Sequence, residues 1–361
     1  MNLSRSPHII TIDETDQTET RIELFLWNTG SQPPDPQYTL SKKIPSSNNT
    51  ATYYNISPYT EEYYRFTTFQ NIYNVYDQAI STNFVVQYVV EKYKTIGGVE
   101  SSAGTESGEF MNGYGYYMEG QNPLNFTTVG LDEGEYFYNF ETGADTSLPQ
   151  YMAGTLDAFL SDSNFFIRYT NSRTGVVTDI PFSSTGVRVF PRVHHTNLAD
   201  GNKTQLMRGS SVRWTATFKP QCEPKYQPVV IDFINKYGSW ARIFFQKAKT
   251  RNITVKSDSY KANPSSLPYS PTAEGQVRNI NTTGQETIKL NTGFVNDGYG
   301  EYLQQLLLSE KINLLDSETS SQYQPVTVQT KSLKKQTGLN DGTINYELTF
   351  DFAFDIINNV I

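Results

Sequence analysis

Cysteine is almost absent from this sequence. Among 361 residues there is one, Cys222, so no disulfide bond can form within the chain. Such sparse use of cysteine is typical of proteins made in reducing compartments. No run approaches the roughly 18 apolar residues that a membrane-spanning helix needs, and the first residues lack the apolar core of a signal peptide. We therefore expect synthesis in the cytoplasm, no export by a standard route and no membrane contact.

Charge of one sign is not concentrated anywhere in the chain. The 29 Lys and Arg and the 37 Asp and Glu residues are interspersed and leave a net charge of −8. Two short basic clusters are typical of strand edges that Lys protects from pairing; they are Lys247, Lys249 and Arg251, and Lys331, Lys334 and Lys335. Because nucleic-acid binding depends on clustered cations, we expect no nucleic-acid sequence recognition.

Aromatic residues are abundant, at 14% of the chain against 18% for charged residues. Aromatic side chains favour strands, and tyrosine also suits contact surfaces. The clearest strand is near the C-terminus, where a period of two puts five large residues on one face: Tyr346, Leu348, Phe350, Phe352 and Phe354. Similar short strands recur along the chain. The predicted fold class is mainly β, with two β-sandwich-like domains and few short helices.

The length also favours two domains, because 361 residues exceed the usual size of one hydrophobic core. Prolines near residue 220 interrupt the strand pattern and place the boundary there. We expect an N-terminal β-rich domain over 1–219, with a flexible Gly- and Ser-rich loop near 97–113. A C-terminal β-sandwich-like domain over 220–361 is expected to carry one amphipathic helix near 296–310.

Local patterns also predict how some strands are connected. Strands at 38–44 and 51–56 flank a polar loop and are expected to pair as a hairpin. The apolar runs on either side of the sequence NKYGSW predict a second hairpin, with positive φ at Asn235 and Gly238.

Two further features are expected in the C-terminal half. Strands at 252–257 and 286–291 are predicted on either side of a loop rich in Pro and Ser. Asn296 and Asp297 are expected to cap the amphipathic helix.

Residues that carry catalysis or bind metals do not occur in the patterns that such sites need. Adjacent side chains on a strand point to opposite faces, so His194 and His195 are not expected to share a metal. Carboxylates that a glycoside hydrolase could use occur at Asp132, Glu133 and Glu135, and oxygens that could bind calcium occur in Asp200-Gly201-Asn202 and Asn296-Asp297-Gly298, but both patterns are more typical of polar turns. Cys222, considered as a nucleophile, is more typical of a buried thiol. We predict no catalytic residue, no cofactor and no metal, and a protein that is not an enzyme.

The stretch MNGYGYYM, residues 111–118, contains the candidate contact residues Tyr114, Tyr116 and Tyr117. Exposed tyrosine rings in a Gly-rich segment can stack on sugar rings or on a partner protein. Packing within the domain is the competing interpretation.

Three blocks of the sequence share a framework of strands rather than a catalytic signature. They are RIELFLWNTG with PQYTLSKKI and NISPYTEEY, then CEPKYQPVVIDFINKYGSWARIFFQ, and finally LLLSEKINLLD with QPVTVQTKSLKKQTGLNDGTINYELTFDFAFDIIN. These blocks resemble structural proteins of tailed phages and prophages of Bacteroidota. The resemblance implies a virion component of the tail, neck or baseplate, assembled in the cytoplasm of the host bacterium.

The partners that the resemblance implies are other copies of the chain in a ring, and neighbouring tail or neck proteins. Ring closure requires head-to-tail interfaces. Sixfold symmetry is expected for a tail position and twelvefold symmetry for a neck position. We therefore expect a structural virion subunit that acts by self-assembly and docking. The alternative is a glycan-binding adhesin or receptor-binding protein of the virion that uses the three tyrosines, and a glycan hydrolase ranks third.

Overall fold

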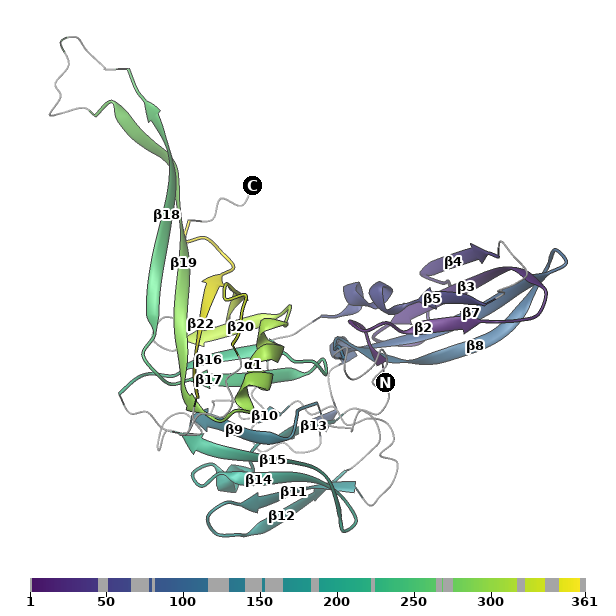
Figure 1. The fold of residues 1–361 in the computed structure, drawn as a ribbon, viewed down its shortest axis with the longest axis horizontal. Helices are drawn as coiled ribbons and strands as arrows, with labels where there is room; N and C mark the ends of the chain where they lie inside the picture. The colour runs from purple at the N-terminus through teal and green to yellow at the C-terminus, as the bar shows by residue number, and fades with distance from the viewer. Residues whose placement is uncertain are drawn as a thin grey trace. The chain divides into compact units, whose positions relative to one another are not determined.

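The computed structural model is mainly β, as predicted, with several sheets and sandwich-like packing (Figure 1). It divides into two compact units, Met1–Gln221 with Asp232–Arg242, and Cys222–Ile231 with Ile243–Ile361. The domain boundary expected after residue 219 lies close to the end of the first segment. The inclusion of residues 232–242 in the first unit was not predicted. The structure describes residues 2–44, 51–65, 78–79, 82–115, 130–139, 151–152, 165–182, 188–221, 225–263, 268, 275–316, 322–334 and 344–357.

The first unit begins with a five-stranded sheet, in the order β1-β8-β7-β3-β4, and a two-stranded sheet of β2 and β5. The elements of this region are β1 (Asn2–Leu3), β2 (Ile9–Ile12), β3 (Gln17–Trp27), β4 (Tyr38–Lys43), β5 (Thr52–Asn55), η1 (Ser57–Tyr63), η2 (Thr82–Phe84), β7 (Val85–Ile96) and β8 (Val99–Met111). Alternate residues of β3 and β7 are buried, including Ile22, Leu24 and Val90. Ile10 of β2 and Tyr54 of β5 join them. The two sheets therefore share one apolar core.

The hairpin expected between 38–44 and 51–56 was wrong. β4 pairs with β3, whereas β5 pairs with β2. Closeness in sequence favoured the hairpin, but the observed pairing places Tyr54 directly opposite Ile10 and buries both. Burial of these two side chains determines the pairing of β5.

The flexible loop expected near 97–113 was also wrong, because most of it is strand β8. The reversal is limited to Gly97 and Gly98, whose positive φ values of 58° and 80° suit a two-residue hairpin turn. A Cβ atom on Gly108 would lie 2.9 Å from the ring of Tyr88 on the neighbouring strand. Glycine at this position makes room for an aromatic ring.

Two further sheets complete the first unit, with the orders β12-β11-β14-β15-β9 and β10-β13-β6. Their strands, with one short 3-10 helix, are β6 (Gln78–Ala79), β9 (Gly134–Asn139), β10 (Tyr151–Met152), β11 (Phe165–Asn171), β12 (Val177–Pro181), β13 (Arg188–Pro191), η4 (His195–Asn197), β14 (Asn202–Arg208) and β15 (Ser211–Gln221). Ile167, Leu206 and Trp214 are directly paired across β11, β14 and β15, and all three are buried. They mark the core face of the larger sheet.

A seven-stranded sheet has the order β17-β16-β20-β21-β22-β19-β18, and most of it belongs to the second unit. Its strands, with one helix, are β16 (Val229–Ile234), β17 (Trp240–Phe245), β18 (Thr250–Lys261), β19 (Val277–Val295), α1 (Tyr299–Leu307), β20 (Ile312–Asp316), β21 (Gln324–Val328) and β22 (Ile344–Phe352). Ile288 pairs with Phe350, and Leu290 pairs with Leu348, all four fully buried. These pairs form the core face of β19 and β22.

β22 confirms the strand predicted from the alternation of large residues. Its four large residues up to Phe352 are buried, but Phe354 is 62% exposed because the strand ends at Phe352. The predicted helix is confirmed as α1 and is shorter than expected. The side-chain cap expected from Asn296 and Asp297 was wrong: the N-terminal cap residue is Gly298, and no side chain makes a capping hydrogen bond. Asn296 contacts the start of the helix through its backbone carbonyl, which accepts from the Tyr299 N–H.

The β16–β17 hairpin, predicted from its two apolar runs, is buried on both faces. Every residue of both strands is buried, including a charged pair. Arg242 donates from Nε and Nη2 to the two carboxylate oxygens of Asp232, at 2.5 and 2.6 Å. Both side chains are 1% exposed. A two-point ion pair of this kind satisfies charges that burial would otherwise destabilise strongly.

The turn of this hairpin lies in 232–242, which belongs to the first unit, and it contacts other loops of that same unit. Gly238 has a φ of 81°, as predicted, but Asn235 does not have a positive φ and acts through its side chain instead. Asn235 Oδ1 accepts from the backbone N–H groups of Tyr237 and Ser239, and Nδ2 donates to the Gly130 carbonyl at 2.6 Å. A Cβ atom on Gly113 would overlap the Lys236 carbonyl oxygen, so only glycine lets the backbone at position 113 lie this close to the turn.

Removing one partner of the buried ion pair should strongly destabilise the chain. We expect Asp232→Asn to lower the free energy of unfolding by about 3 kcal/mol or more, because Arg242 is left buried without a carboxylate. The double variant Asp232→Val with Arg242→Met should recover most of this loss, because it removes both charges. Chemical denaturation followed by circular dichroism measures both; wild-type stability of Asp232→Asn would contradict the assignment.

Candidate functional site

Tyr114, the first of the three predicted contact tyrosines, is buried at 8% exposure. The Arg5 guanidinium lies over its ring, 4.9 Å from the centroid, and its backbone N–H donates to the Lys236 carbonyl at 2.7 Å. This ring is therefore part of the packing of the first unit. Tyr116 and Tyr117 lie outside the described residues, so their contact role stays a prediction.

The three carboxylates considered for glycoside hydrolysis make separate contacts within the first unit. Asp132 accepts a hydrogen bond from the Tyr237 hydroxyl at 2.5 Å and lies 3.2 Å from Lys236 Nζ. Glu133 accepts from the backbone N–H of Thr215 at 2.9 Å, and Glu135 forms an ion pair with Lys219. Each contact ties the segment before or within β9 to a neighbouring element. The structure therefore gives each of these carboxylates a structural partner.

His194 and His195 lie against each other, with ring centroids 4.4 Å apart, because they begin the short helix η4 rather than occupy a strand. His194 caps this helix: its Nδ1 accepts from the Thr196 N–H and lies 2.7 Å from Thr196 Oγ1. Among the described residues, no group of three His, Cys, Asp or Glu side chains is arranged to hold a metal ion.

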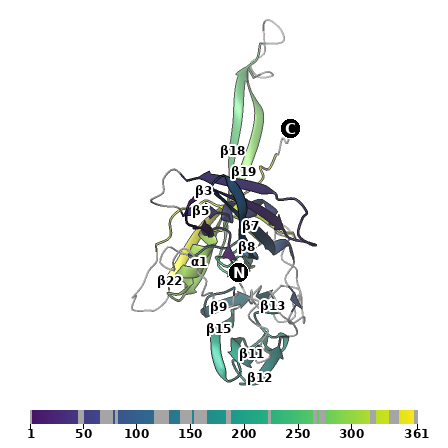
Figure 2. The same cartoon turned by 90° about the vertical axis from the view of Figure 1, so that its right-hand side faces the viewer.

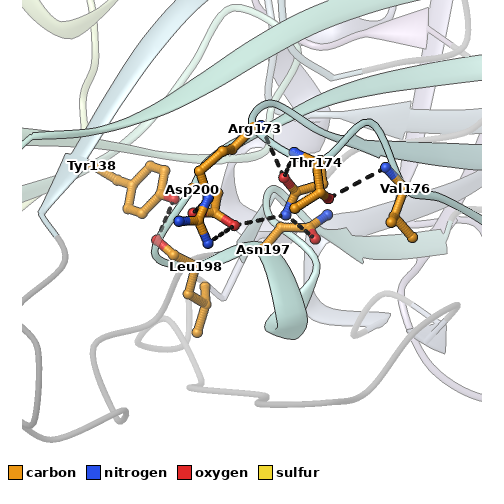
Figure 3. Close-up of polar contacts among 8 residues, drawn as sticks. Tyr138, Arg173, Thr174, Val176, Asn197, Leu198 and Asp200 are labelled. Atoms are coloured by element: carbon orange, nitrogen blue, oxygen red, sulfur yellow. Dashed lines mark hydrogen bonds and ion pairs between the residues drawn. The ribbon is translucent and has the colours of Figure 1, made fainter.

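Asp200, considered as a calcium ligand, belongs to a hydrogen-bonded cluster in the first unit (Figure 3). Asn171 Nδ2 donates to Asn197 Oδ1 at 2.9 Å and to Asp200 Oδ2 at 3.1 Å, while Asn171 Oδ1 accepts from the N–H groups of Arg173 and Thr174. Arg173 Nε lies 2.8 Å from Asp200 Oδ1. The cluster fixes the turn between β11 and β12 against the loop that precedes β14.

The remaining sequence candidates add no site. Asn296-Asp297-Gly298 forms the turn that starts α1. Cys222 lies outside the described residues.

The strands predicted at 252–257 and 286–291 are confirmed as parts of β18 and β19. Sequence reasoning missed that both strands are longer and form a two-stranded arm in the second unit. The arm comprises 250–261 and 277–286, the whole of β18 and the first half of β19 (Figures 1 and 2). β22 pairs with β19 only from Thr287 onward, so in the arm the ladder partner of β19 is β18. Most arm residues are exposed, but 283–286, nearest the ladder with β22, are half-buried or buried.

Exposed apolar side chains lie along one face of the arm. Arg251 lies opposite the buried Ile288, so alternate residues of β18 from Arg251 onward lie on the core face of the sheet. Two of them, Ile253 and Val255, are nevertheless 61% and 62% exposed. Ile356, after β22, contacts the same face: its N–H donates to the Gly284 carbonyl at 2.7 Å. A Cβ atom on Gly284 would lie 3.4 Å from Ile356 and 3.6 Å from Ile253. The core face of the sheet thus continues onto the arm as a largely exposed apolar strip, in contact with Ile356 at its base.

A buried carboxylate anchors the base of the arm. Asp316, at the end of β20, is 1% exposed and accepts from Lys249 Nζ at 2.8 and 2.9 Å and from Arg251 Nη2 at 2.9 Å. Arg251 also donates to Glu286 at 2.5 Å across the β18–β19 ladder. Part of the predicted basic cluster is therefore paired with carboxylates rather than solvated. These contacts hold the first residues of β18 in place while the outer residues extend into solvent.

None of the helices in the described part of the chain is both long and apolar enough to cross a bilayer. No protein-family model, no curated protein and no solved structure matches this chain. The geometry of the arm is therefore the main guide to function.

Neutralising the anchor should loosen the base of the arm. We expect Asp316→Asn to lower the free energy of unfolding by about 2 kcal/mol, because Lys249 and Arg251 lose a buried carboxylate. Glu286→Gln is the matched control, since it removes only a partly exposed partner of Arg251 and should cost less than about 1 kcal/mol. Equal effects of the two substitutions in chemical denaturation would contradict the anchoring role of Asp316.

Acid should destabilise the region around His194. Burial first, and then the neighbouring His195, lower the pKa of His194. The unfolded chain therefore binds this proton more readily, and stability is lost as the pH falls through the unfolded pKa of about 6.5 toward the lower folded pKa. His194→Asn keeps a side-chain acceptor for the Thr196 N–H but does not titrate. We expect the melting temperature of this variant to fall less than that of wild type between pH 7 and 5; parallel pH profiles would refute the role of His194.

Proposed function

We propose that this chain is a structural subunit of a tailed-phage particle, at a tail, neck or baseplate position, that works by associating with copies of itself and with neighbouring particle proteins. The observation that carries the proposal is the arm. A two-stranded ribbon is marginally stable on its own, and an open strand edge next to exposed Ile253 and Val255 is a surface that other chains can cover.

The resemblance to phage structural proteins supports the same proposal. The blocks that carry the resemblance coincide with framework strands, including β3, β22 and the two strands of the buried hairpin, β16 and β17. A subunit whose work is assembly depends on a rigid framework and on surfaces, because repeated contacts require the same geometry in every copy. The implied location is the virion, with assembly in the host cytoplasm, and the implied partners are further copies in a ring and neighbouring tail or neck proteins.

The mass of the purified chain tests this proposal. Light scattering should give a species of several copies, and negative-stain imaging should show a closed ring of six or twelve. A strict monomer up to about 100 μM would contradict self-assembly, since stable protein interfaces commonly bind in or below the micromolar range.

An arm-shortened variant provides the matched control. Val255 and Gly284 are directly opposite each other in the ladder, so an Asn-Gly turn can replace residues 256–283 without changing the sheet. This variant should fold with an unchanged melting temperature but with weaker assembly. Assembly as strong as wild type would show that the arm does not contribute.

A further inference from the structure

β18 presents a long free edge. It is the last strand of the seven-stranded sheet, and nearly all of its residues are exposed. Its outward backbone N–H and C=O groups form a template that can pair with another strand. The β18–β19 ladder contains a β-bulge opposite Ser257. The extra residue of this bulge lies in β19, where Asn281 has a φ of 52°. β18 itself stays regular from Thr250 to Lys261.

Two opposite charges lie on one face of this edge. Lys256 and Asp258 are both exposed and are separated by one residue, so their side chains point to the same side of the ribbon. Asp258 accepts a hydrogen bond from Asn281 Nδ2 at 3.3 Å, and neither charge has an ion-pair partner in the described part of the chain. An edge lysine on its own discourages pairing, but a lysine followed by an aspartate favours one register.

We propose that β18 of one copy pairs antiparallel with β18 of a second copy, about a two-fold axis at Ser257. In this register Lys256 of each copy lies directly opposite Asp258 of the other, and Thr254 lies opposite Tyr260. Opposite charges and aromatic–β-branched pairs at facing positions stabilise antiparallel strands. The adjacent registers place Lys256 opposite Lys256 or Asp258 opposite Asp258, both of which are destabilising. The charge order therefore selects a second copy as the partner and fixes the register.

This inference rests on the proposed function, because it names the surface and the partner through which the chain associates with itself. A two-fold contact of this kind closes on itself as a pair. Contacts that close a ring therefore lie elsewhere on the chain. The two kinds of contact can be tested separately.

Cysteine cross-linking tests the register. In a Cys222→Ser background, Ser257→Cys places two thiols opposite each other, at the Cα separation of about 4.5 to 5.5 Å typical of antiparallel pairs, which suits a disulfide. We expect a covalent dimer of the full chain under mild oxidation. The matched control is Thr254→Cys in the same background, because the two 254 positions would be about 20 Å apart in this register.

A charge swap tests the pairing without cross-linking. Lys256→Asp should weaken association about tenfold, because the new carboxylate at position 256 of each copy would face Asp258 of the other. Adding Asp258→Lys should restore association, because the swapped charges are again complementary. Sedimentation equilibrium measures the dissociation constants, and circular dichroism checks that these exposed substitutions leave the fold intact.

The outcomes separate the two proposals. Cross-linking of Ser257→Cys alone, with rescue by the double swap, supports the pairing. Cross-linking of Thr254→Cys instead overturns the register. A chain that assembles but shows neither the Ser257→Cys cross-link nor a charge-swap effect overturns the β18 pairing and leaves self-assembly through another surface in place. A chain that stays monomeric overturns the pairing and counts against the proposed function as well.

Discussion

The β16–β17 hairpin is the constraint on which the first unit depends most. Its residues are buried on both faces, so the Asp232–Arg242 pair must be satisfied internally. Its turn also supplies groups that hold two other segments of the first unit, at 113–114 and 130–132. The Lys236 carbonyl accepts a hydrogen bond from the Tyr114 N–H, and the Asn235 side chain donates one to the Gly130 carbonyl. The Asp132 carboxylate accepts a hydrogen bond from the Tyr237 hydroxyl and forms an ion pair with Lys236. Residues that looked like ligand or catalytic candidates thus serve to hold this turn.

The second unit combines a rigid base with an exposed extension in one continuous strand. β19 passes from the buried ladder with β22 into the arm, and Asp316 secures the neighbouring end of β18. Local stability is therefore expected to fall along the arm, from the anchored base to the exposed outer residues. Pairing of a free strand edge with another chain would stabilise an element of this kind, which is the physical basis of the proposed role in assembly.

The sequence predicted features that depend on local periodicity and failed where distant contacts decide. The alternation in β22, the helix α1 and the β16–β17 hairpin were all recognisable. The pairing of β5 with β2 and the identity of β8 were not, because they depend on burial of Tyr54 against Ile10 and on the ring of Tyr88 over Gly108. Of the arm, only the strand at 252–257 was predicted. Its partner in β19 was missed because most residues of 277–285 are exposed and lack the alternation that reveals a strand.

Hydrogen exchange of the β18 backbone amides tests most directly whether the arm is an assembly surface. The outward amides of 253–261 lack a ladder partner in a single chain and should exchange rapidly in dilute solution. We expect them to become protected at concentrations where the chain assembles, while the amides of β12, another edge strand, stay unchanged. Unaltered exchange of β18 in the assembled protein would contradict the account.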